Sequence, residues 1–240
     1  MIRADEIAWN LAGVRERVDA ALLAAGRMPG DVCLLAVSKL MPAEDVADAL
    51  AAGQRDLGES YGQELRDKHQ AVADLVAARG LPPPRWHFIG PLQSNKVKYV
   101  AGKVALLHSV GSAEILAEIE RKAAAAAVVQ DCLVQVNVAG ESQKSGVAPT
   151  ELPALLDRFA ELSHVRCTGL MVIPPYDEDA ECSRPHFVAL RELRDQHAAT
   201  GRPNVKLEEL SMGMSHDLEV AIAEGATIVR VGTAIFGSRA

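Results

Sequence analysis

Short runs of apolar and β-branched residues alternate along the chain with longer, alanine-rich stretches that have helical periodicity. Parallel strands joined by crossover helices produce this alternation. The pattern predicts eight strands, at 32–38, 55–59, 85–89, 104–109, 132–138, 165–172, 205–211 and 227–231. Eight such units in 240 residues favour a single α/β domain over 1–240, a β/α barrel of the TIM type, because these barrels have roughly 250 residues. A doubly wound open sheet built from the same strands is the alternative fold.

Helical patterns fill the segments between the predicted strands. The pattern at 42–52 opens with a proline at an early helical position, and the pattern at 112–126 begins with a serine suited to capping. An extra helix is expected before the first strand, because one face of this segment is apolar, at Leu11, Val14, Val18 and Leu22. We expect this helix to pack on the outside of the barrel or to close its bottom.

Composition and charge narrow the class of protein. A formal charge of -7 argues against nucleic acid or an anionic membrane as a partner. The cysteines lack CxxC spacing, which favours a reducing compartment. The opening segment MIRADEIAWN carries acids where a signal peptide is basic, and no apolar run reaches the ~18 residues of a membrane span. We therefore expect a cytoplasmic protein whose partners are small molecules or proteins.

Functional residues of a β/α barrel lie at the C-terminal ends of the strands and in the loops that follow them. The predicted strand ends contain one lysine, Lys39, directly after the apolar run Leu34–Val37. Desolvation by that strand favours the free amine that Schiff-base chemistry needs. The alternative is an ordinary solvated lysine at the end of a strand.

Two glycine-containing segments begin at the ends of the last two predicted strands: 211–217 at the end of the seventh and 230–233 at the end of the eighth. Barrels commonly bind phosphate in the loops at these positions, through backbone N–H groups and hydroxyl donors such as those of Ser215 and Thr233. Ser215 can equally act as an ordinary N-cap of the next helix. Arg230 interrupts an apolar strand, and a buried arginine needs a partner.

Other strand-end residues give weaker signals. Glu59 suits either a general base or a structural acceptor, and His87 either faces the mouth of the barrel or lies satisfied in the core. Asn137 suits either ligand contact or the support of a loop. The segment 90–96 lacks the second glycine and the final Ser or Thr of a Walker phosphate loop, so we interpret it as a loop and helix start. The spacing of histidines and cysteines indicates no metal site.

Five segments together resemble the pyridoxal phosphate homeostasis family, also called the proline synthetase co-transcribed proteins. They are LLAVSK (34–39), WHFIGPLQSNK (86–96), GLM (169–171), SMGMS (211–215) and VRVGTAIFG (229–237). The resemblance covers nearly the whole chain and implies a barrel similar to the N-terminal domain of alanine racemase. It also implies an internal aldimine between pyridoxal phosphate and Lys39.

The resemblance further implies that the phosphate is held by Ser215, Gly232 and Thr233, and that Arg230 faces the pyridine nitrogen. Ser60 stands where the family usually has an asparagine, so the contact of that amide is not carried over. The candidate cofactor-binding residues are Lys39, Ser60, His87, Asn137, Met171, Ser211, Ser215, Arg230, Gly232 and Thr233.

No catalytic residue is assigned. An arginine beside the pyridine nitrogen disfavours its protonation and weakens the ring as an electron sink. A two-base racemase also needs an acid or base on the face opposite the lysine. Alanine racemase takes that group from a tyrosine in a second domain, which we do not expect in this chain.

We therefore expect a monomer that stores, buffers or delivers pyridoxal phosphate, with apo forms of pyridoxal-phosphate enzymes as candidate partners. A pyridoxal-phosphate-dependent amino-acid racemase is the alternative function. A barrel that binds another phosphorylated metabolite is a third.

Overall fold

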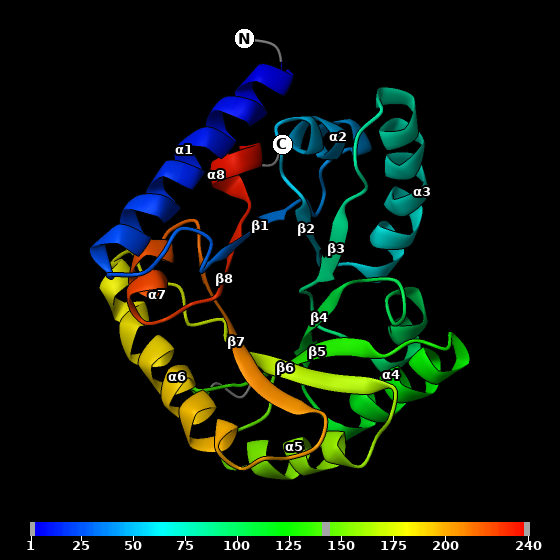
Figure 1. Ribbon diagram of the computed structural model, residues 1–240, viewed down its shortest axis with the longest axis vertical. Helices are drawn as coiled ribbons and strands as arrows, with labels where there is room; N and C mark the ends of the chain where they lie inside the picture. The colour runs from blue at the N-terminus through cyan, green and yellow to red at the C-terminus, as the bar shows by residue number, and fades with distance from the viewer. Residues whose placement is uncertain (1–2, 141–144, 238–240) are drawn as a thin grey trace.

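Eight parallel strands close into a barrel in which each strand pairs with its neighbours in chain order (Figure 1). The computed structural model describes residues 3–140 and 145–237. The strands are β1 (Cys33–Val37), β2 (Asp56–Glu59), β3 (Arg85–Phe88), β4 (Leu106–Val110), β5 (Gln130–Gln135), β6 (Val165–Met171), β7 (Val205–Met214) and β8 (Ile228–Val231). Pairing of β1 with β8 closes the barrel, so the predicted TIM-type fold is confirmed and the open-sheet alternative is wrong.

Helices surround the barrel on its outside (Figure 1). They are α1 (Arg3–Ala24), α2 (Ala43–Ala51), α3 (Gly62–Arg79), α4 (Ala113–Ala125), α5 (Leu152–Ala160), α6 (Arg184–Ala198), α7 (Leu218–Ala223) and α8 (Thr233–Phe236), with short 3-10 helices η1 (Ser94–Tyr99) and η2 (Ala180–Ser183). The predicted cap of the fourth helix is present, because Ser112 accepts a hydrogen bond from the N–H of Ile115 at 3.2 Å.

Alternation along the strands separates the barrel interior from the layer beneath the helices. On β8, Ile228 points inward and Val229 packs outward in the main hydrophobic core. The inner apolar cluster consists of Leu35, Leu106, Leu133, Met171 and Ile228. Arg230 is buried two positions after Ile228, as strand periodicity predicts. The interior therefore holds an apolar layer with polar side chains beside it.

The extra helix α1 packs on the outside of the barrel, because its apolar face contacts α2, α7 and α8. Arg3 donates to the carboxylate of Asp45 at 2.6 Å and to the carbonyl of Phe236 at 2.7 Å. Arg17 donates to the carbonyl of Ser215 at 3.0 Å, in the loop after β7. The helix thus supports the loops at the C-terminal end of the barrel.

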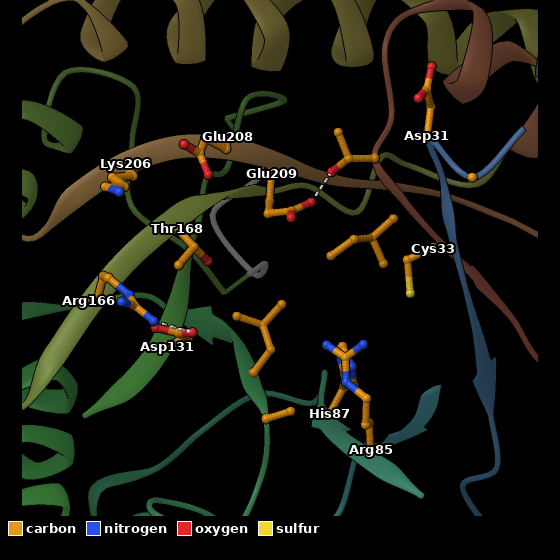
Figure 2. Close-up of a pocket in the computed structure, with 15 residues that line it drawn as sticks. Asp31, Cys33, Arg85, His87, Asp131, Arg166, Thr168, Lys206, Glu208 and Glu209 are labelled. Atoms are coloured by element: carbon orange, nitrogen blue, oxygen red, sulfur yellow. Dashed lines mark hydrogen bonds and ion pairs between the residues drawn. The ribbon is translucent and has the colours of Figure 1, made fainter. Parts of the chain in front are cut away.

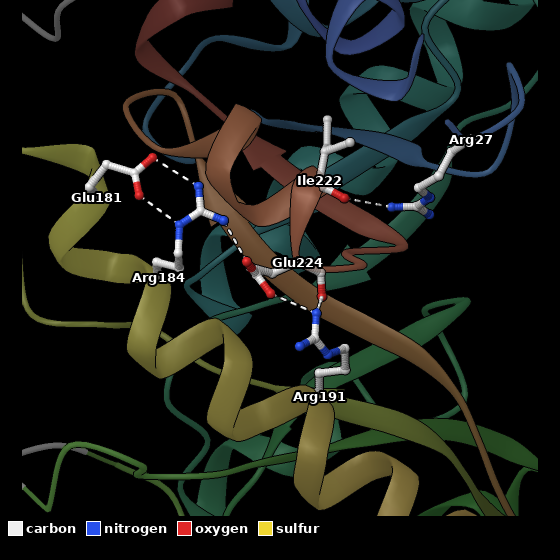
Figure 3. A network of polar contacts seen from close by, with 6 residues as sticks. All are labelled: Arg27, Glu181, Arg184, Arg191, Ile222 and Glu224. Carbon is white, nitrogen blue, oxygen red and sulfur yellow. Dashed lines mark hydrogen bonds and ion pairs between the residues drawn. The ribbon is translucent and has the colours of Figure 1, made fainter. Parts of the chain in front are cut away.

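A polar network fixes α7 against α6 (Figure 3). Glu224, at the end of α7, accepts hydrogen bonds from Arg184 and, at 2.6 Å, from Arg191. On the other side, Arg27 donates to the carbonyls of Ile222 at 3.0 Å and Ala226 at 2.8 Å. Because α7 follows the loop at 215–217, these contacts hold one wall of the site described next.

The seventh strand is longer than predicted. It continues to Met214 instead of ending at Ser211, with a register shift against β8 between these two residues. Gly213 has φ +90°, and a Cβ there would lie 2.5 Å from the Cβ of Ala221. Glycine at this position therefore permits an irregular strand that a side chain would block.

Candidate functional site

A cavity of about 290 Å³ opens at the C-terminal end of the barrel. Six of the ten predicted cofactor-binding residues line it: Lys39, Ser60, Ser215, Arg230, Gly232 and Thr233. Its volume lies at the lower end of the roughly 300–1,000 Å³ typical of small-molecule sites. The residues that line the cavity lie at or after the C-terminal ends of β1, β2, β3, β6, β7 and β8, the position where functional residues of a barrel are expected.

Lys39 lies in a tight turn after β1. The next residue, Leu40, has φ +64°, an uncommon conformation for a residue other than glycine. The N–H of Leu40 donates to Glu64 Oε1 at 2.6 Å, and the N–H of Met41 donates to the Ser38 carbonyl at 3.0 Å. These bonds hold the backbone on both sides of the lysine in one conformation.

A buried ion-pair network supports that turn from below. Lys68 Nζ lies 2.8 Å from the Ser38 carbonyl, 2.8 Å from Glu59 Oε1 and 2.7 Å from Glu64 Oε1. Ser38 Oγ also donates to Glu59 Oε1 at 2.7 Å. Burial raises the pKa of Glu59, against the opposing effect of Lys68 and these hydrogen bonds. Glu59 does not line the cavity, so the structure supports its role as a structural acceptor.

Ser60 sits against a glycine that no other residue can replace without movement. A Cβ on Gly90 would lie 2.0 Å from the Ser60 carbonyl oxygen. Ser109 Oγ donates to the Gly90 carbonyl at 2.5 Å and fixes it from the other side. Gly90, the first residue of the segment 90–96, therefore packs directly against the backbone of Ser60.

The loops after β7 and β8 bring two hydroxyl groups together. Thr233 Oγ1 lies 3.4 Å from Ser215 Oγ, and both residues line the cavity. The carboxylate of Asp217 accepts from the N–H of Met214 at 2.7 Å and holds the loop closed. Asp217, and not Ser215, occupies the N-cap position of α7, so the capping alternative for Ser215 is wrong.

Arg230 is almost fully buried, with 4% of its surface exposed. Its Nη1 donates to Ser211 Oγ at 2.7 Å and its Nη2 to the Val172 carbonyl at 2.9 Å. Burial lowers the pKa of Arg230 to about 10, and the attraction of Asp217 offsets only part of this. The arginine remains cationic at neutral pH, with neutral oxygens as its hydrogen-bond acceptors.

The other four candidates do not line this cavity. Met171 and Ser211 are fully buried in the barrel beneath it. Asn137 lies beyond β5, where its N–H donates to the Val147 carbonyl at 2.9 Å. His87 lines a different cavity, of about 610 Å³, at the N-terminal end of the strands (Figure 2). That larger cavity carries charges of both signs and lies away from Lys39.

Six residues that line the cavity were not predicted as binding residues: Val37, Ile89, Ile173, Tyr176, Met214 and His216. The Tyr176 and His216 rings lie 5.8 Å apart. Both follow the C-terminal ends of strands, β6 and β7 respectively, so the barrel rule was the signal available for them. Their side-chain direction depends on loop geometry that periodicity does not give.

Two kinds of feature are absent from residues 3–140 and 145–237. No cluster of three or more His, Cys, Asp or Glu residues in these ranges could hold a metal ion. None of the helices there is long and apolar enough to cross a membrane.

Comparison with known proteins identifies the family. The family described as alanine racemase, N-terminal domain, matches residues 3–240. The pyridoxal phosphate homeostasis protein of Aquifex aeolicus is 47% identical over 230 residues, covering 96% of this chain and 97% of that protein. The Escherichia coli K12 protein of the same name is 41% identical, covering 98% and 97%. The chain belongs to the pyridoxal phosphate homeostasis proteins.

Solved structures agree with this membership of the pyridoxal phosphate homeostasis proteins. PipY of Synechococcus elongatus, in a structure with pyridoxal phosphate bound, is 36% identical with a TM-score of 0.80, covering 96% of this chain and all of that chain. Alanine racemase of Corynebacterium glutamicum has a TM-score of 0.70 at 16% identity, covering 98% and 62%. This second likeness shows the barrel fold alone. The predicted family is confirmed.

Proposed function

We propose that this protein binds pyridoxal phosphate in the C-terminal cavity, attached to Lys39, and serves to store, buffer or deliver the cofactor. The observation that carries the proposal is the meeting of Lys39, Arg230 and two hydroxyl residues around one cavity. Relatives that are 41–47% identical bear the name pyridoxal phosphate homeostasis protein. PipY, at 36% identity, has been solved with pyridoxal phosphate bound.

The cavity suits this cofactor chemically. Pyridoxal phosphate supplies an aldehyde that condenses with a primary amine, with loss of one water. Lys39 provides the amine, and apolar side chains such as Val37, Ile89 and Ile173 provide a wall for a flat ring. Arg230 and the hydroxyls supply donors for an anionic ligand.

Within this proposal, Ser215, Gly232 and Thr233 hold the phosphate and Arg230 faces the pyridine nitrogen. The close approach of the two hydroxyls, at 3.4 Å, supports a shared acceptor between them. A Cβ on Gly232 would lie 3.4 Å from the Val37 carbonyl, so glycine leaves the backbone accessible beside the end of β1. Ser60 stays at the cavity edge with a shorter side chain than the family's usual asparagine.

The experiment that tests this function measures the visible absorbance of the purified protein with added pyridoxal phosphate. Borohydride reduction should then fix the cofactor on one peptide, and mass spectrometry should place it on Lys39. Lys206→Ala, at an exposed lysine on β7, is the matched control and should retain full labelling. Absence of the absorbance band from the wild-type protein would remove the proposal.

Two alternatives give different results in the same system. If the barrel binds another phosphorylated metabolite, Lys39→Ala should keep its phosphate affinity with little change in the ligand spectrum. Amino-acid racemisation is favoured by one observation, that Tyr176 and His216 line the cavity that holds Lys39. Exchange of the α-proton of L-amino acids in deuterated water, above the rate with free cofactor, would establish that activity.

We also propose that the protein acts in the cytoplasm as a monomer of one domain, with apo forms of pyridoxal-phosphate enzymes as partners. All four cysteines are free thiols, which fits a reducing compartment. Sedimentation of the purified protein tests the monomer. Delivery is tested by the transfer of cofactor from the holo-protein to a pyridoxal-phosphate apo-enzyme. This transfer should be faster than uptake from an equal concentration of free cofactor.

A further inference from the structure

A continuous chain of hydrogen-bonded polar side chains crosses the barrel interior toward the C-terminal cavity, referred to below as the cofactor cavity. Arg230 Nη1 lies 2.7 Å from Ser211 Oγ, which lies 2.9 Å from His108 Nδ1. His108 Nε2 lies 3.0 Å from His87 Nδ1, and His87 Nε2 lies 3.1 Å from Asp56 Oδ1. We refer to Arg230, Ser211, His108, His87 and Asp56 as the inner chain.

The inner chain is shielded from water over most of its length. Ser211 and His108 are completely buried, and His87 and Arg230 are 2% and 4% exposed. His87 emerges at the cavity on the N-terminal side of the barrel, beside Arg85 (Figure 2). Because buried donors and acceptors need partners, each link of the chain constrains the next.

Donor and acceptor chemistry gives the inner chain one consistent direction. An arginine only donates, so Ser211 Oγ accepts from Arg230 and can pass its hydroxyl hydrogen to His108 Nδ1. A neutral His108 then donates from Nε2 to His87 Nδ1. His87 in turn donates from Nε2 to Asp56, because an ionised carboxylate only accepts. The two ends of the chain therefore demand the same arrangement.

Electrostatics agree with this arrangement. Burial, reinforced by the charge of Arg230, holds the pKa of His108 well below its usual value of 6.5. Burial raises the pKa of Asp56, but the hydrogen bond from His87 and the charge of Arg85 outweigh it, so that the pKa is lowered. A neutral imidazole thus lies between a cationic end and an anionic end.

We propose that His108, through Ser211, is a positioning residue that fixes the orientation of Arg230 in the cofactor cavity, and that His87 and Asp56 fix His108. The proposal rests on the proposed binding of pyridoxal phosphate in that cavity. Arg230 has a long side chain, and its contacts with Ser211 and Val172 hold two of its guanidinium nitrogens. Removing the histidine leaves Ser211 free to rotate, and the guanidinium loses its fixed direction.

The test compares His108→Leu and His108→Gln with the wild-type protein. We expect His108→Leu to weaken pyridoxal phosphate binding about tenfold, roughly the effect of one lost hydrogen bond, and to shift the visible absorbance maximum of the bound cofactor. His108→Gln keeps one donor and one acceptor and should restore most of the affinity and the wild-type maximum. A purely structural histidine would leave both readouts unchanged.

Leu107→Ala is the matched control, because Leu107 is fully buried on the same strand but packs outward in the main core. It should lower stability without changing affinity or absorbance. If wild-type protein binds no cofactor, the proposed function fails. If wild-type protein binds and His108→Leu equals it in affinity and absorbance, only the positioning role fails.

Nitrogen NMR of the histidine rings in the cofactor-free protein tests the inner chain even if His108→Leu does not fold. At pH 7 we expect His108 to be neutral with its hydrogen on Nε2 and Nδ1 as acceptor. A hydrogen on Nδ1 of His108, or an imidazolium at that residue, would overturn the proposed direction of the chain.

Discussion

Lys68→Met removes the cation that holds the turn below Lys39. The lysine is 8% exposed, and its ammonium contacts two carboxylates and one carbonyl at 2.7–2.8 Å. Glu59 is completely buried, so the substitution leaves a carboxylate without its main counter-charge. Breaking one partner of a buried pair costs roughly 3–5 kcal/mol, and we expect a loss of unfolding free energy in this range at pH 8.

The loss should shrink at lower pH, because a buried carboxylate can take up a proton. The pKa of Glu59 in the folded protein is already raised above its ordinary value of 4.5. The contribution of Glu59 to stability is therefore complete below pH 4.5 and declines as pH rises through the pKa of the folded state. Without Lys68 that folded value rises further, and the decline extends to higher pH. Protonation of Glu59 should thus relieve part of the penalty between pH 8 and pH 5.

Urea unfolding followed by circular dichroism, at several pH values, measures these differences. Lys206→Met, at an exposed lysine, is the matched control and should change the unfolding free energy by less than about 0.5 kcal/mol. The double variant Lys68→Met with Glu59→Gln should recover a large part of the loss, because the buried charge is gone. A loss at pH 8 below about 1 kcal/mol, as for an exposed pair, would show that Lys68 is not the counter-charge that stabilises buried Glu59.

Two further predictions concern the packing of Gly90 against Ser60 and the inner chain. Gly90→Ala places a Cβ 2.0 Å from the Ser60 carbonyl oxygen, so it should lower the unfolding free energy by roughly 1–3 kcal/mol and weaken cofactor binding. Gly13→Ala is the control, because its Cβ meets no described atom within 4 Å, and it should not destabilise the protein. Equal stability and affinity of the two variants would contradict this packing. His108 binds protons less readily in the folded than in the unfolded chain, because its pKa is lowered by burial. The contribution of His108 to the unfolding free energy should therefore be complete above its ordinary pKa of 6.5. At lower pH this contribution should decrease by up to about 1.4 kcal/mol per pH unit. His108→Gln should remove that part of the slope in urea titrations, and an unchanged slope would count against a buried neutral histidine.

The order and type of elements could be predicted from sequence because strand runs and helical stretches have different periods. The chain repeats this alternation through all eight units, and the outward or inward position of Ile228, Val229 and Arg230 follows from a period of two. The barrel rule together with the family resemblance then gave ten candidates, of which six line the cavity. The number of domains and the oligomeric state stay predictions.

Partners of buried polar groups could not be predicted in the same way. The sequence indicated that Arg230 needs a partner, but Ser211 lies 19 residues earlier on β7, where an irregular register sets which side chains meet. Lys68 lies on a helix, and its role depends on contact with Ser38, 30 residues away. His87 was predicted as a cofactor contact, and its side chain instead joins His108 to Asp56 within the barrel. Long-range side-chain pairing of this kind leaves no periodic signal.

The proposed function depends most on the attachment of pyridoxal phosphate to Lys39 in the C-terminal cavity. The most direct measurement is borohydride reduction of the cofactor-loaded protein, followed by mass spectrometry of its peptides. We expect one phosphopyridoxyl modification, on Lys39, that is absent in Lys39→Ala and unchanged in Lys206→Ala. Stoichiometric modification at another lysine, or no modification of a correctly folded wild-type protein, would contradict it.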